Sequence, residues 1–195
     1  DLTRVSLELG GKAPAIVAAD ADLDTAVDNI VASRTINAGQ VCTCVERIYV
    51  HEDVADDFEA RFVAAMRDIE IGDPRDDPDM GPQVSAAEVE KTREAIRRAV
   101  EQGATVATGG PTVEAPPTDG GFWIHPTVLA DVQQGMDVIS EEVFGPVAPI
   151  VEVDSVEQAV EYANDSRYGL SSYVFTESYR DAMRIAEDLS FGETF

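Results

Sequence analysis

The stretch APAIVAADADLDTAVDNIVASRTINAGQVCTCVERIYV, residues 13–50, decides the fold of this chain. It contains two short apolar runs, residues 15–17 and 47–50, that are rich in residues favoured in strands. Between them Asp22 is placed to cap a helix, because the apolar side chains that follow recur every three or four residues. That apolar face consists of Leu23, Ala26, Val27, Ile30 and Val31. A strand, a helix and a second strand in succession predict an α/β unit with parallel strands.

The same alternation of strands and helices continues along the rest of the chain. Further strand-like runs lie at residues 105–107, 150–153 and 172–175. The segments between the runs have helical spacing, and one of them begins at Ser85 with Glu88 three residues on, as in a capping box. The other apolar faces are Val54, Phe58, Phe62, Ala65 and Met66; Val156, Ala159, Val160 and Ala163; and Ala182, Ile185 and Ala186. We therefore predict one α/β domain over residues 1–195, with a largely parallel sheet.

Composition excludes several classes of protein. Of the 195 residues, 44% are hydrophobic and 27% are charged, so the chain can bury a core and is not a disordered protein. No apolar run is long enough to span a membrane, and the first residues lack the pattern of a signal peptide. Residues 72–82 and 109–121 are rich in proline and glycine, and we expect both stretches to be surface connections.

The net charge is the unusual property of this sequence. Thirty-eight Asp and Glu residues stand against fourteen Lys and Arg, which gives a formal net charge of -24. A field of this sign repels nucleic acid and anionic lipid, so we expect neither nucleic acid nor a membrane as a partner. The protein is either an ordinary acidic cytoplasmic protein or one from a salt-rich cytoplasm, where surface carboxylates keep the fold soluble. We favour the salt-rich cytoplasm.

The segment NAGQVCTC, residues 37–44, is a candidate for nucleophilic chemistry. Cys42 follows a Gly-Gln turn between a predicted helix and a predicted strand. Amides at a turn or helix end can lower the pKa of a thiol from about 8.5, which makes the reactive thiolate more abundant. Considered alone, the segment favours the alternative of two buried structural cysteines, Cys42 and Cys44.

Two further segments contain side chains suited to catalysis or binding. In SLELGGK, residues 6–12, Glu8 stands in an apolar strand end before a Gly-Gly turn, where a raised pKa would suit a general base. The alternative is a surface carboxylate on a strand edge. In SEEVFGPV, residues 140–147, an acid, an aromatic ring, Gly and Pro are typical of a rigid turn that contacts a ribose and a flat heterocycle. The alternative is a turn with a structural role only.

Together and in this order, the three segments resemble the catalytic domain of the aldehyde dehydrogenase superfamily. The matching motifs are LELGGKAP, NAGQVCTC and EEVFGPV, followed by Tyr168-Gly169-Leu170 and Phe191-Gly192. The resemblance implies an open, twisted, largely parallel sheet with helices on both faces. The wording INAGQVCTCVERIYV is most similar to the branch of the superfamily that acts on lactaldehyde or glycolaldehyde.

The resemblance also implies roles for individual residues. Cys42 matches the catalytic nucleophile, its backbone N–H matches one donor of the oxyanion hole, and Glu8 matches the general base. Glu142, Phe144 and Leu9 match residues that contact the nicotinamide and its ribose. The implied reaction is the NAD(P)+-dependent oxidation of an aldehyde to a carboxylic acid through a thiohemiacetal and a thioester on the cysteine.

Two alternatives to that reaction stay open within the same fold. One is a semialdehyde dehydrogenase that acylates coenzyme A, although family members of that kind often lack the carboxylate that Glu8 matches. The other is a catalytically dead scaffold, which has no reason to retain both Glu8 and Cys42. Cys44 matches a variable position of the superfamily, so we expect it to have a packing role.

Several parts of the superfamily have no counterpart in this sequence. There is no GxGxxG motif, and the N-terminal cofactor domain, an oxyanion-hole Asn and the C-terminal oligomerisation segment are not represented. We therefore expect an excised domain or part of a longer protein that is inactive alone and forms a homo-dimer or tetramer at full length. The choice of NAD or NADP and of the aldehyde stays open. In the sequence no second His or Cys stands at metal-ligand spacing from His51 or His125, so we expect no metal site.

Overall fold

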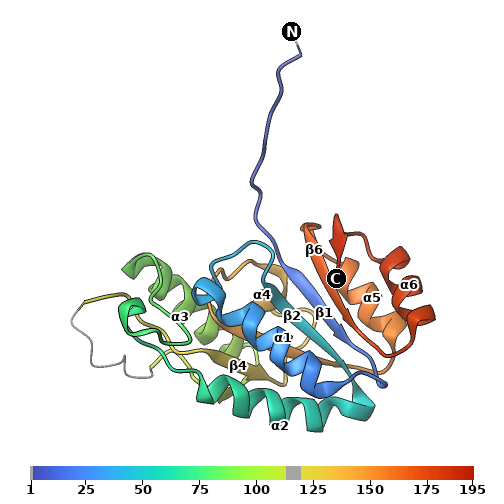
Figure 1. Ribbon diagram of the computed structural model, residues 1–195, viewed down its shortest axis with the longest axis horizontal. Coiled ribbons are helices and arrows are strands. Elements are labelled where there is room, and N and C mark those ends of the chain that lie inside the picture. The colour runs from blue at the N-terminus through green and yellow to red at the C-terminus, as the bar shows by residue number, and fades with distance from the viewer. Residues whose placement is uncertain (1, 113–119) are drawn as a thin grey trace.

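The computed structural model describes residues 2–112 and 120–195 and contains one central sheet flanked by helices (Figure 1). The strands are β1 (Ala13–Val17), β2 (Val45–His51), β3 (Thr105–Thr108), β4 (Thr127–Ala130), β5 (Val147–Val153), β6 (Ser171–Phe175) and β7 (Glu193–Thr194). The helices are α1 (Leu23–Thr35), α2 (Glu52–Asp68), α3 (Ala86–Glu101), α4 (Asp137–Ser140), α5 (Val156–Asn164) and α6 (Tyr179–Asp188), with 3₁₀ turns η1 (Ile36–Gly39) and η2 (Pro74–Asp76).

The sheet is largely parallel, as predicted. Its strand order is β3-β4-β5-β2-β1-β6-β7, and every described pairing is parallel except that of β3 with β4. β1, α1 and β2 form the unit expected from residues 13–50, because β1 and β2 lie side by side with α1 between them in sequence. The sequence did not predict the short strands β4 and β7 or the single-turn helix α4.

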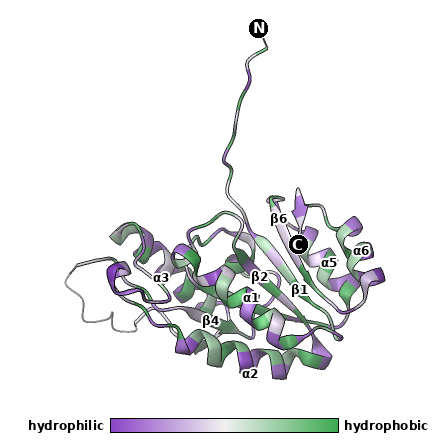
Figure 2. Ribbon diagram, in the orientation of Figure 1, coloured by the Kyte–Doolittle hydropathy of each residue, from purple (hydrophilic) through white to green (hydrophobic). Residues whose placement is uncertain are grey.

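Helices cover both faces of the sheet, as the resemblance implied. Alternate residues of each strand point to opposite faces, so that Ile16 and Tyr49 pack with α3, α4, α5 and α6, whereas Val17 and Ile48 pack with α1 and α2. Figure 2 shows the strands as apolar and the outer helix surfaces as mixed or polar. Each face therefore has its own hydrophobic core, and burial of both fixes the register of the strands.

Two helices, α1 and α3, begin at the cap residues that the sequence predicted. The Asp22 carboxylate accepts a hydrogen bond from the backbone N–H of Thr25 at 3.0 Å, and the Ser85 hydroxyl accepts one from the N–H of Glu88 at 3.2 Å. Both bonds satisfy N–H groups that have no partner within the first turn. Residues 72–82 form a surface connection between α2 and α3, as expected. The prediction for 109–121 falls largely on residues 113–119, which lie outside the described residues.

The prediction that residues 6–9 form an apolar strand end was wrong. Residues 2–9 are extended but pair with no described strand, and they project from the body of the domain (Figure 1). Their side chains are exposed, including Leu7 at 67% and Leu9 at 76%. A strand needs a hydrogen-bonded neighbour, and none of the described strands lies beside this segment, so the period-two pattern alone does not produce a strand.

The parallel pairing brings three segments that are distant in sequence to the same end of the central strands. β5, β2 and β1 are neighbours, and their amino-terminal ends lie on the same side of the sheet because the pairings are parallel. The turn at residues 10–12 leads into β1, the loop at residues 40–44 leads into β2, and the turn at residues 142–146 leads into β5. The motifs quoted from the sequence are therefore adjacent in space although they are far apart in the chain, as the contact between Gly11 and Glu142 across 131 positions shows.

Candidate functional site

Glycines allow the three segments to touch through their backbones. A Cβ atom at Gly11 would overlap the carbonyl oxygen of Cys42, and a Cβ atom at Gly39 would overlap the backbone of Gly145. Gly39 has φ +74°, a conformation that favours glycine. The Cys42 loop, residues 40–44, is therefore held between the turn before β1 and the turn before β5.

The Cys42 loop is anchored at both of its ends. The N–H of Cys44 donates to the carbonyl of Val41 at 3.0 Å, which closes a tight turn around Cys42. The carbonyl of Thr43 accepts a hydrogen bond from the Tyr173 hydroxyl of β6 at 2.9 Å. Within the described residues no acceptor takes the backbone N–H of Cys42, so this donor is available beside a half-buried thiol.

Cys44 has a different environment from Cys42. Its side chain is 2% exposed, and burial raises the pKa of its thiol, although the nearby Arg34 guanidinium opposes that shift. A buried thiol with a raised pKa is neither accessible nor ionised at neutral pH. These observations support the packing role expected for Cys44.

The Phe144 turn, residues 142–146, brings a carboxylate and an aromatic ring to the same place. Oε1 of Glu142 accepts a hydrogen bond from the N–H of Gly11 at 2.7 Å, while Oε2 has no hydrogen-bond partner among the described residues. Phe144 has φ +56°, a left-handed conformation that is strained for a bulky side chain. One carboxylate oxygen thus fixes the turn before β1, and the other is free to accept from a ligand hydroxyl.

A cavity of about 640 Å³ lies where these segments meet. Of the predicted site residues, Glu8, Cys42, Glu142 and Phe144 line it. Its other lining residues are Gly10, Gln40, Val41, Val84, Glu88 and Lys91. Ligand pockets commonly have volumes of roughly 300–1,000 Å³, and an aromatic ring with few polar groups is their usual lining. Its volume is therefore that of a pocket for a small organic ligand, and its lining includes one aromatic ring, one cation and three carboxylates.

Sequence reasoning did not assign the wall of this cavity that comes from the start of α3. Glu88 and Lys91 are three residues apart on the first turns of α3, and the side chain of Val84 is 74% exposed. Oε1 of Gln40 accepts a hydrogen bond from the N–H of Val84 at 2.9 Å, which joins the Cys42 loop to this wall. The capping-box pattern located the start of α3. Nothing in the sequence indicated that this start faces the Cys42 loop.

Glu8 and Leu9 lie at the open side of the site. Both are exposed and belong to the projecting segment 2–9. Glu8 lines the cavity, and Leu9 is not among its lining residues. The expectation that Glu8 stands in apolar surroundings was wrong for the described residues, because its side chain is in contact with solvent.

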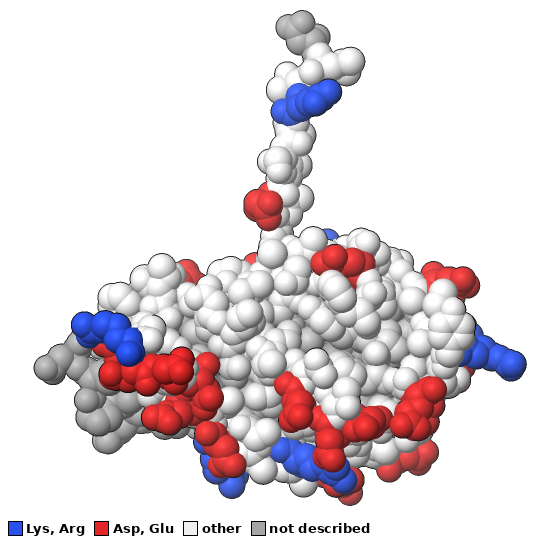
Figure 3. Space-filling model, viewed as in Figure 1, with Lys and Arg blue, Asp and Glu red and all other residues white. Residues whose placement is uncertain are grey.

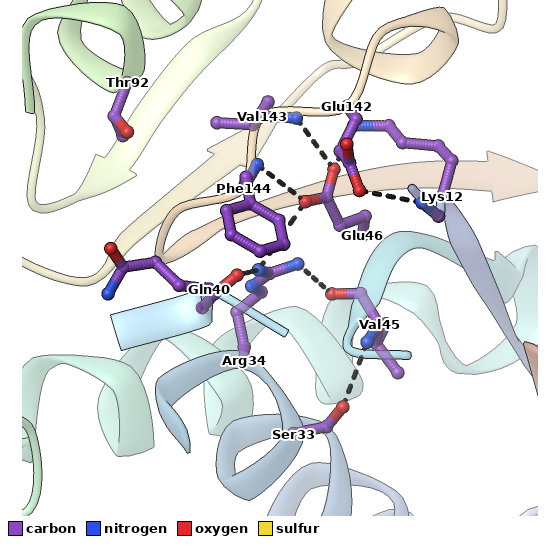
Figure 4. A network of polar contacts seen from close by, with 12 residues as sticks. Lys12, Ser33, Arg34, Gln40, Val45, Glu46, Thr92, Glu142, Val143 and Phe144 are labelled. Carbon is purple, nitrogen blue, oxygen red and sulfur yellow. Dashed lines mark hydrogen bonds and ion pairs between the residues drawn. The ribbon is translucent and has the colours of Figure 1, made fainter. Parts of the chain in front are cut away.

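Behind the cavity is a buried network of charges that sequence reasoning also missed (Figure 4). The Glu46 carboxylate accepts hydrogen bonds from the Lys12 ammonium at 2.6 Å, from the N–H of Val143 at 3.0 Å and from the N–H of Phe144 at 2.9 Å. Nη2 of Arg34 lies 3.7 Å from Oε1 of Glu46. Burial lowers the pKa of Lys12, against the influence of Glu46.

Two further observations concern the described residues as a set. In residues 2–112 and 120–195, no helix combines the length and apolar character needed to cross a membrane. Over the same ranges, no three or more His, Cys, Asp or Glu side chains are grouped so as to hold a metal ion.

Comparison with known proteins gives one consistent answer. The model of the aldehyde dehydrogenase family matches residues 1–195. Lactaldehyde dehydrogenase of Escherichia coli strain K12 is 49% identical over 197 residues, covering 100% of this chain and 40% of that protein. The chain therefore spans about two fifths of the length of the curated relatives that it matches.

Solved structures agree with the sequence match. A structure of 3,6-anhydro-L-galactose dehydrogenase in complex with NAP has a TM-score of 0.92 and 46% identity, covering 96% of this chain and 40% of that one. Betaine aldehyde dehydrogenase from Staphylococcus aureus in complex with NAD+ has a TM-score of 0.93 and 36% identity, covering 99% and 39%.

Proposed function

This chain belongs to the aldehyde dehydrogenase family, and we propose that its cavity is the site at which an aldehyde is oxidised to a carboxylic acid with NAD(P)+. The observation that carries the proposal is the position of Cys42. Its half-buried thiol lines the cavity of about 640 Å³, its backbone N–H has no acceptor among the described residues, and Glu8, Glu142 and Phe144 line the same space.

Cys42 is the proposed nucleophile. Its sulfur adds to the carbonyl carbon of the aldehyde, and the carbonyl π electrons move to the oxygen to give a thiohemiacetal. The N–H of Cys42, which has no acceptor among the described residues, would donate to that oxygen. A preorganised donor of this kind typically lowers the activation free energy of such a step by about 3 kcal/mol. The anchored turn of residues 41–44 fixes thiol and donor relative to each other.

Glu142, Phe144 and Leu9 are the proposed contacts of the nicotinamide nucleotide. The free Oε2 of Glu142 suits a ribose hydroxyl, and the half-buried Phe144 ring offers a flat apolar surface. Leu9 would contribute its backbone, since its side chain does not line the cavity. When bound, the nucleotide supplies the hydride acceptor that converts the thiohemiacetal to a thioester. We leave NAD and NADP as equal candidates.

Glu8 is the proposed general base for hydrolysis of that thioester. It lines the same cavity as Phe144 and is exposed to water. It would accept a proton as a water molecule attacks the thioester carbon, and the departing Cys42 sulfur then leaves as thiolate. The products are the carboxylic acid, the reduced nucleotide and one proton. A coenzyme A thiol in place of water would give an acyl-coenzyme A.

A small hydroxyaldehyde is the proposed substrate class. The supporting fact is the 49% identity to a protein named lactaldehyde dehydrogenase, against 38–40% for two proteins named succinate-semialdehyde dehydrogenase. For the full-length protein we further propose a cytoplasmic location, a salt-rich environment and a homo-oligomer, in keeping with the acidic composition and the family.

The test uses the full-length polypeptide that contains this chain, in molar potassium chloride. Reduction of NAD+ and NADP+ is followed by absorbance with lactaldehyde, glycolaldehyde and succinate semialdehyde, and the products are identified. We expect Cys42→Ser to abolish reduction and Cys44→Ser, the matched control, to retain most of it. A folded protein that reduces neither nucleotide with any aldehyde favours the dead scaffold, and acyl-coenzyme A as the product favours the acylating enzyme.

A further inference from the structure

We infer that Glu46, which touches neither substrate nor nucleotide in the proposed reaction, is the positioning residue that sets the Phe144 turn and the Cys42 loop relative to each other. The expected effect of Glu46 on turnover rests on the proposed function. Glu46 lies in β2, four residues after Cys42, and is 3% exposed. The sequence motifs assigned no role to Glu46, although INAGQVCTCVERIYV contains it.

The contacts of Glu46 are divided between its two oxygens. Oε2 accepts from the Lys12 ammonium at 2.6 Å and from the N–H of Val143 at 3.0 Å. Oε1 accepts from the N–H of Phe144 at 2.9 Å. The carboxylate thus joins the segment before β1 to the turn before β5, and it does so from β2, the strand between them.

Arg34 extends the same network to the Cys42 loop. It is fully buried at the end of α1, and its Nη2 lies 3.7 Å from Oε1 of Glu46. Nη2 also donates to the carbonyl of Gly39 at 2.8 Å, and Nη1 donates to the carbonyl of Val45. The two carbonyls flank the Cys42 loop, so one guanidinium group holds both of its ends while the Glu46 carboxylate holds the guanidinium group.

The backbone of these segments needs such support. Phe144 has φ +56°, and Asn37 and Ala38 have φ +49° and +54° just before Gly39. Residues other than glycine adopt this left-handed backbone conformation at a cost in free energy. They keep it only where the contacts around them hold the backbone in place. The N–H of Phe144 that Glu46 binds belongs to a strained residue, and the carbonyl that Arg34 binds ends the strained run.

The charge of Glu46 is part of the inference. Lys12 and Arg34 are both buried cations, and Glu46 is the carboxylate within 4 Å of each in the described part of the chain. A glutamine has one acceptor oxygen, so its amide nitrogen would face either the Lys12 ammonium and Val143 N–H or the Phe144 N–H. Glu46→Gln therefore keeps the size of the side chain but removes half of its acceptors and the charge that Lys12 requires.

The experiment compares Glu46→Gln with Tyr49→Phe in the full-length polypeptide. Tyr49 is also buried in β2 and its hydroxyl accepts from Arg47 and donates to Gln134, but it makes no described hydrogen bond to the Cys42 loop or the Phe144 turn. Three quantities are measured: kcat and KM for the nucleotide, the rate of Cys42 alkylation by iodoacetamide, and Tm. Alkylation is a readout that needs no turnover.

We expect Glu46→Gln to lower kcat by about tenfold or more, because a shift of about 1 Å in a reacting group has effects of that order. It should also raise KM for the nucleotide and change the alkylation rate several-fold. Tyr49→Phe should lower Tm but leave the other quantities within a factor of two. Adding Lys12→Met to Glu46→Gln should recover Tm, because the unpaired ammonium is gone, without recovering kcat.

Results that overturn the inference are distinct from those that overturn the function. If wild-type protein oxidises aldehydes and Glu46→Gln resembles Tyr49→Phe in kcat, KM and alkylation, Glu46 is structural only. If wild-type protein oxidises no aldehyde, the proposed function fails, and an unchanged alkylation rate in Glu46→Gln overturns the inference as well. Should Glu46→Gln not fold, Glu46→Asp, which withdraws the carboxylate but keeps its charge, takes its place in each comparison.

Discussion

Single atoms decide how closely the segments that line the cavity approach one another. The two glycines before β1 illustrate this, since Gly11 leaves no room for a methyl group beside the Cys42 carbonyl and Gly10 has φ +78° with the Glu142 carboxylate against it. The requirement is steric at Gly11 and both steric and conformational at Gly10. A Gly-Gly pair in the sequence indicates a turn, but only the structure shows that the second glycine is needed because the Cys42 loop passes over it.

A methyl group at position 11 tests this directly. Gly11→Ala must displace the Cys42 loop, so we expect the free energy of unfolding to fall by about 2 kcal/mol and aldehyde oxidation to be largely lost. Urea unfolding and initial rates measure the two effects. Gly135→Ala is the matched control, because nothing lies within 4 Å of the added carbon there. Equal effects at both positions would contradict the steric explanation.

The buried carboxylate predicts a pH dependence. Burial by itself raises the pKa of Glu46, but Lys12, Arg34 and the hydrogen bonds of Lys12 and Val143 outweigh it and hold the pKa below the usual range. A carboxyl group with a lowered folded-state pKa contributes its stability above its unfolded pKa, about 4.3, and loses it as the pH falls through the folded value.

The difference in unfolding free energy between wild type and Glu46→Gln isolates that contribution. We expect it to be about 3 kcal/mol and constant between neutral pH and about pH 5, and to shrink as the pH is lowered further. Guanidinium unfolding at a series of pH values measures it. A difference that grows towards low pH would mean that the carboxyl group is not ionised in the folded protein.

Among the elements, α3 connects ordinary helix chemistry to the site. Its N-cap Ser85 accepts a hydrogen bond from Glu88, and its first turns supply Glu88 and Lys91 to the cavity wall. We expect Ser85→Ala to cost about 1 kcal/mol of stability and to raise KM for the nucleotide more than it lowers kcat.

Ser155→Ala is the matched control for that change. Ser155 caps α5 by the same type of bond, from the N–H of Gln158 at 3.3 Å, and α5 does not line the cavity. Thermal melts should show similar losses of stability for both variants, and steady-state kinetics should show a raised KM for Ser85→Ala alone. A raised KM in both variants would mean that general loosening, not the α3 wall, sets nucleotide binding.

Element by element, prediction from sequence succeeded where a local pattern carries the information. Apolar periodicity and caps located α1, α2, α3, α5 and α6, and β-rich runs located the central strands. The sequence did not indicate β4, and residues 6–9 have the pattern of a strand but no described partner. Pairing is a property of two segments, so one segment cannot reveal it.

For the site, too, the sequence predicted the residues that stand in local motifs and missed those whose role depends on contacts between distant segments. Cys42, Glu142 and Phe144 stand in motifs, and the structure brings them to one cavity with Glu8. Glu46 and Arg34 could not be assigned, because their role exists only after β1, β2 and β5 have been placed side by side. The one available signal was the Glu46-Arg47 pair of charges in an otherwise apolar strand, which indicates a buried polar network without naming its partners.

At the scale of the whole molecule, charge is the dominant property. On the visible face the acidic side chains gather along the lower margin and the sides of the domain, with several basic ones beside them, and the middle of the face is largely uncharged (Figure 3). Exposed pairs such as Arg61 with Asp24 and Arg97 with Glu90 relieve part of the repulsion, but the net charge stays at -24. Most carboxylates therefore repel one another in dilute buffer.

Salt should stabilise the fold. Raising potassium chloride from about 0.1 M to 1 M shortens the screening length from about 10 Å to 3 Å, so we expect Tm to rise by several degrees. Differential scanning calorimetry measures the change, and the same range of sucrose, which does not screen charge, serves as the control. A Tm that is unchanged or lower in molar salt would contradict the prediction of a protein adapted to a salt-rich cytoplasm.

The most direct measurement is to trap the acyl group on its sulfur. In the full-length protein, Glu8→Gln should slow hydrolysis, so that mixing with aldehyde and nucleotide gives one equivalent of reduced nucleotide and an acylated protein. Acid quenching and fragmentation mass spectrometry then locate the added mass. We expect acylation of Cys42 in the Glu8→Gln protein and in the same protein with Cys44→Ser added. We expect no acylated protein when Cys42→Ser is added instead. Acylation at another residue, or nucleotide reduction that persists without Cys42, would contradict the role proposed for Cys42.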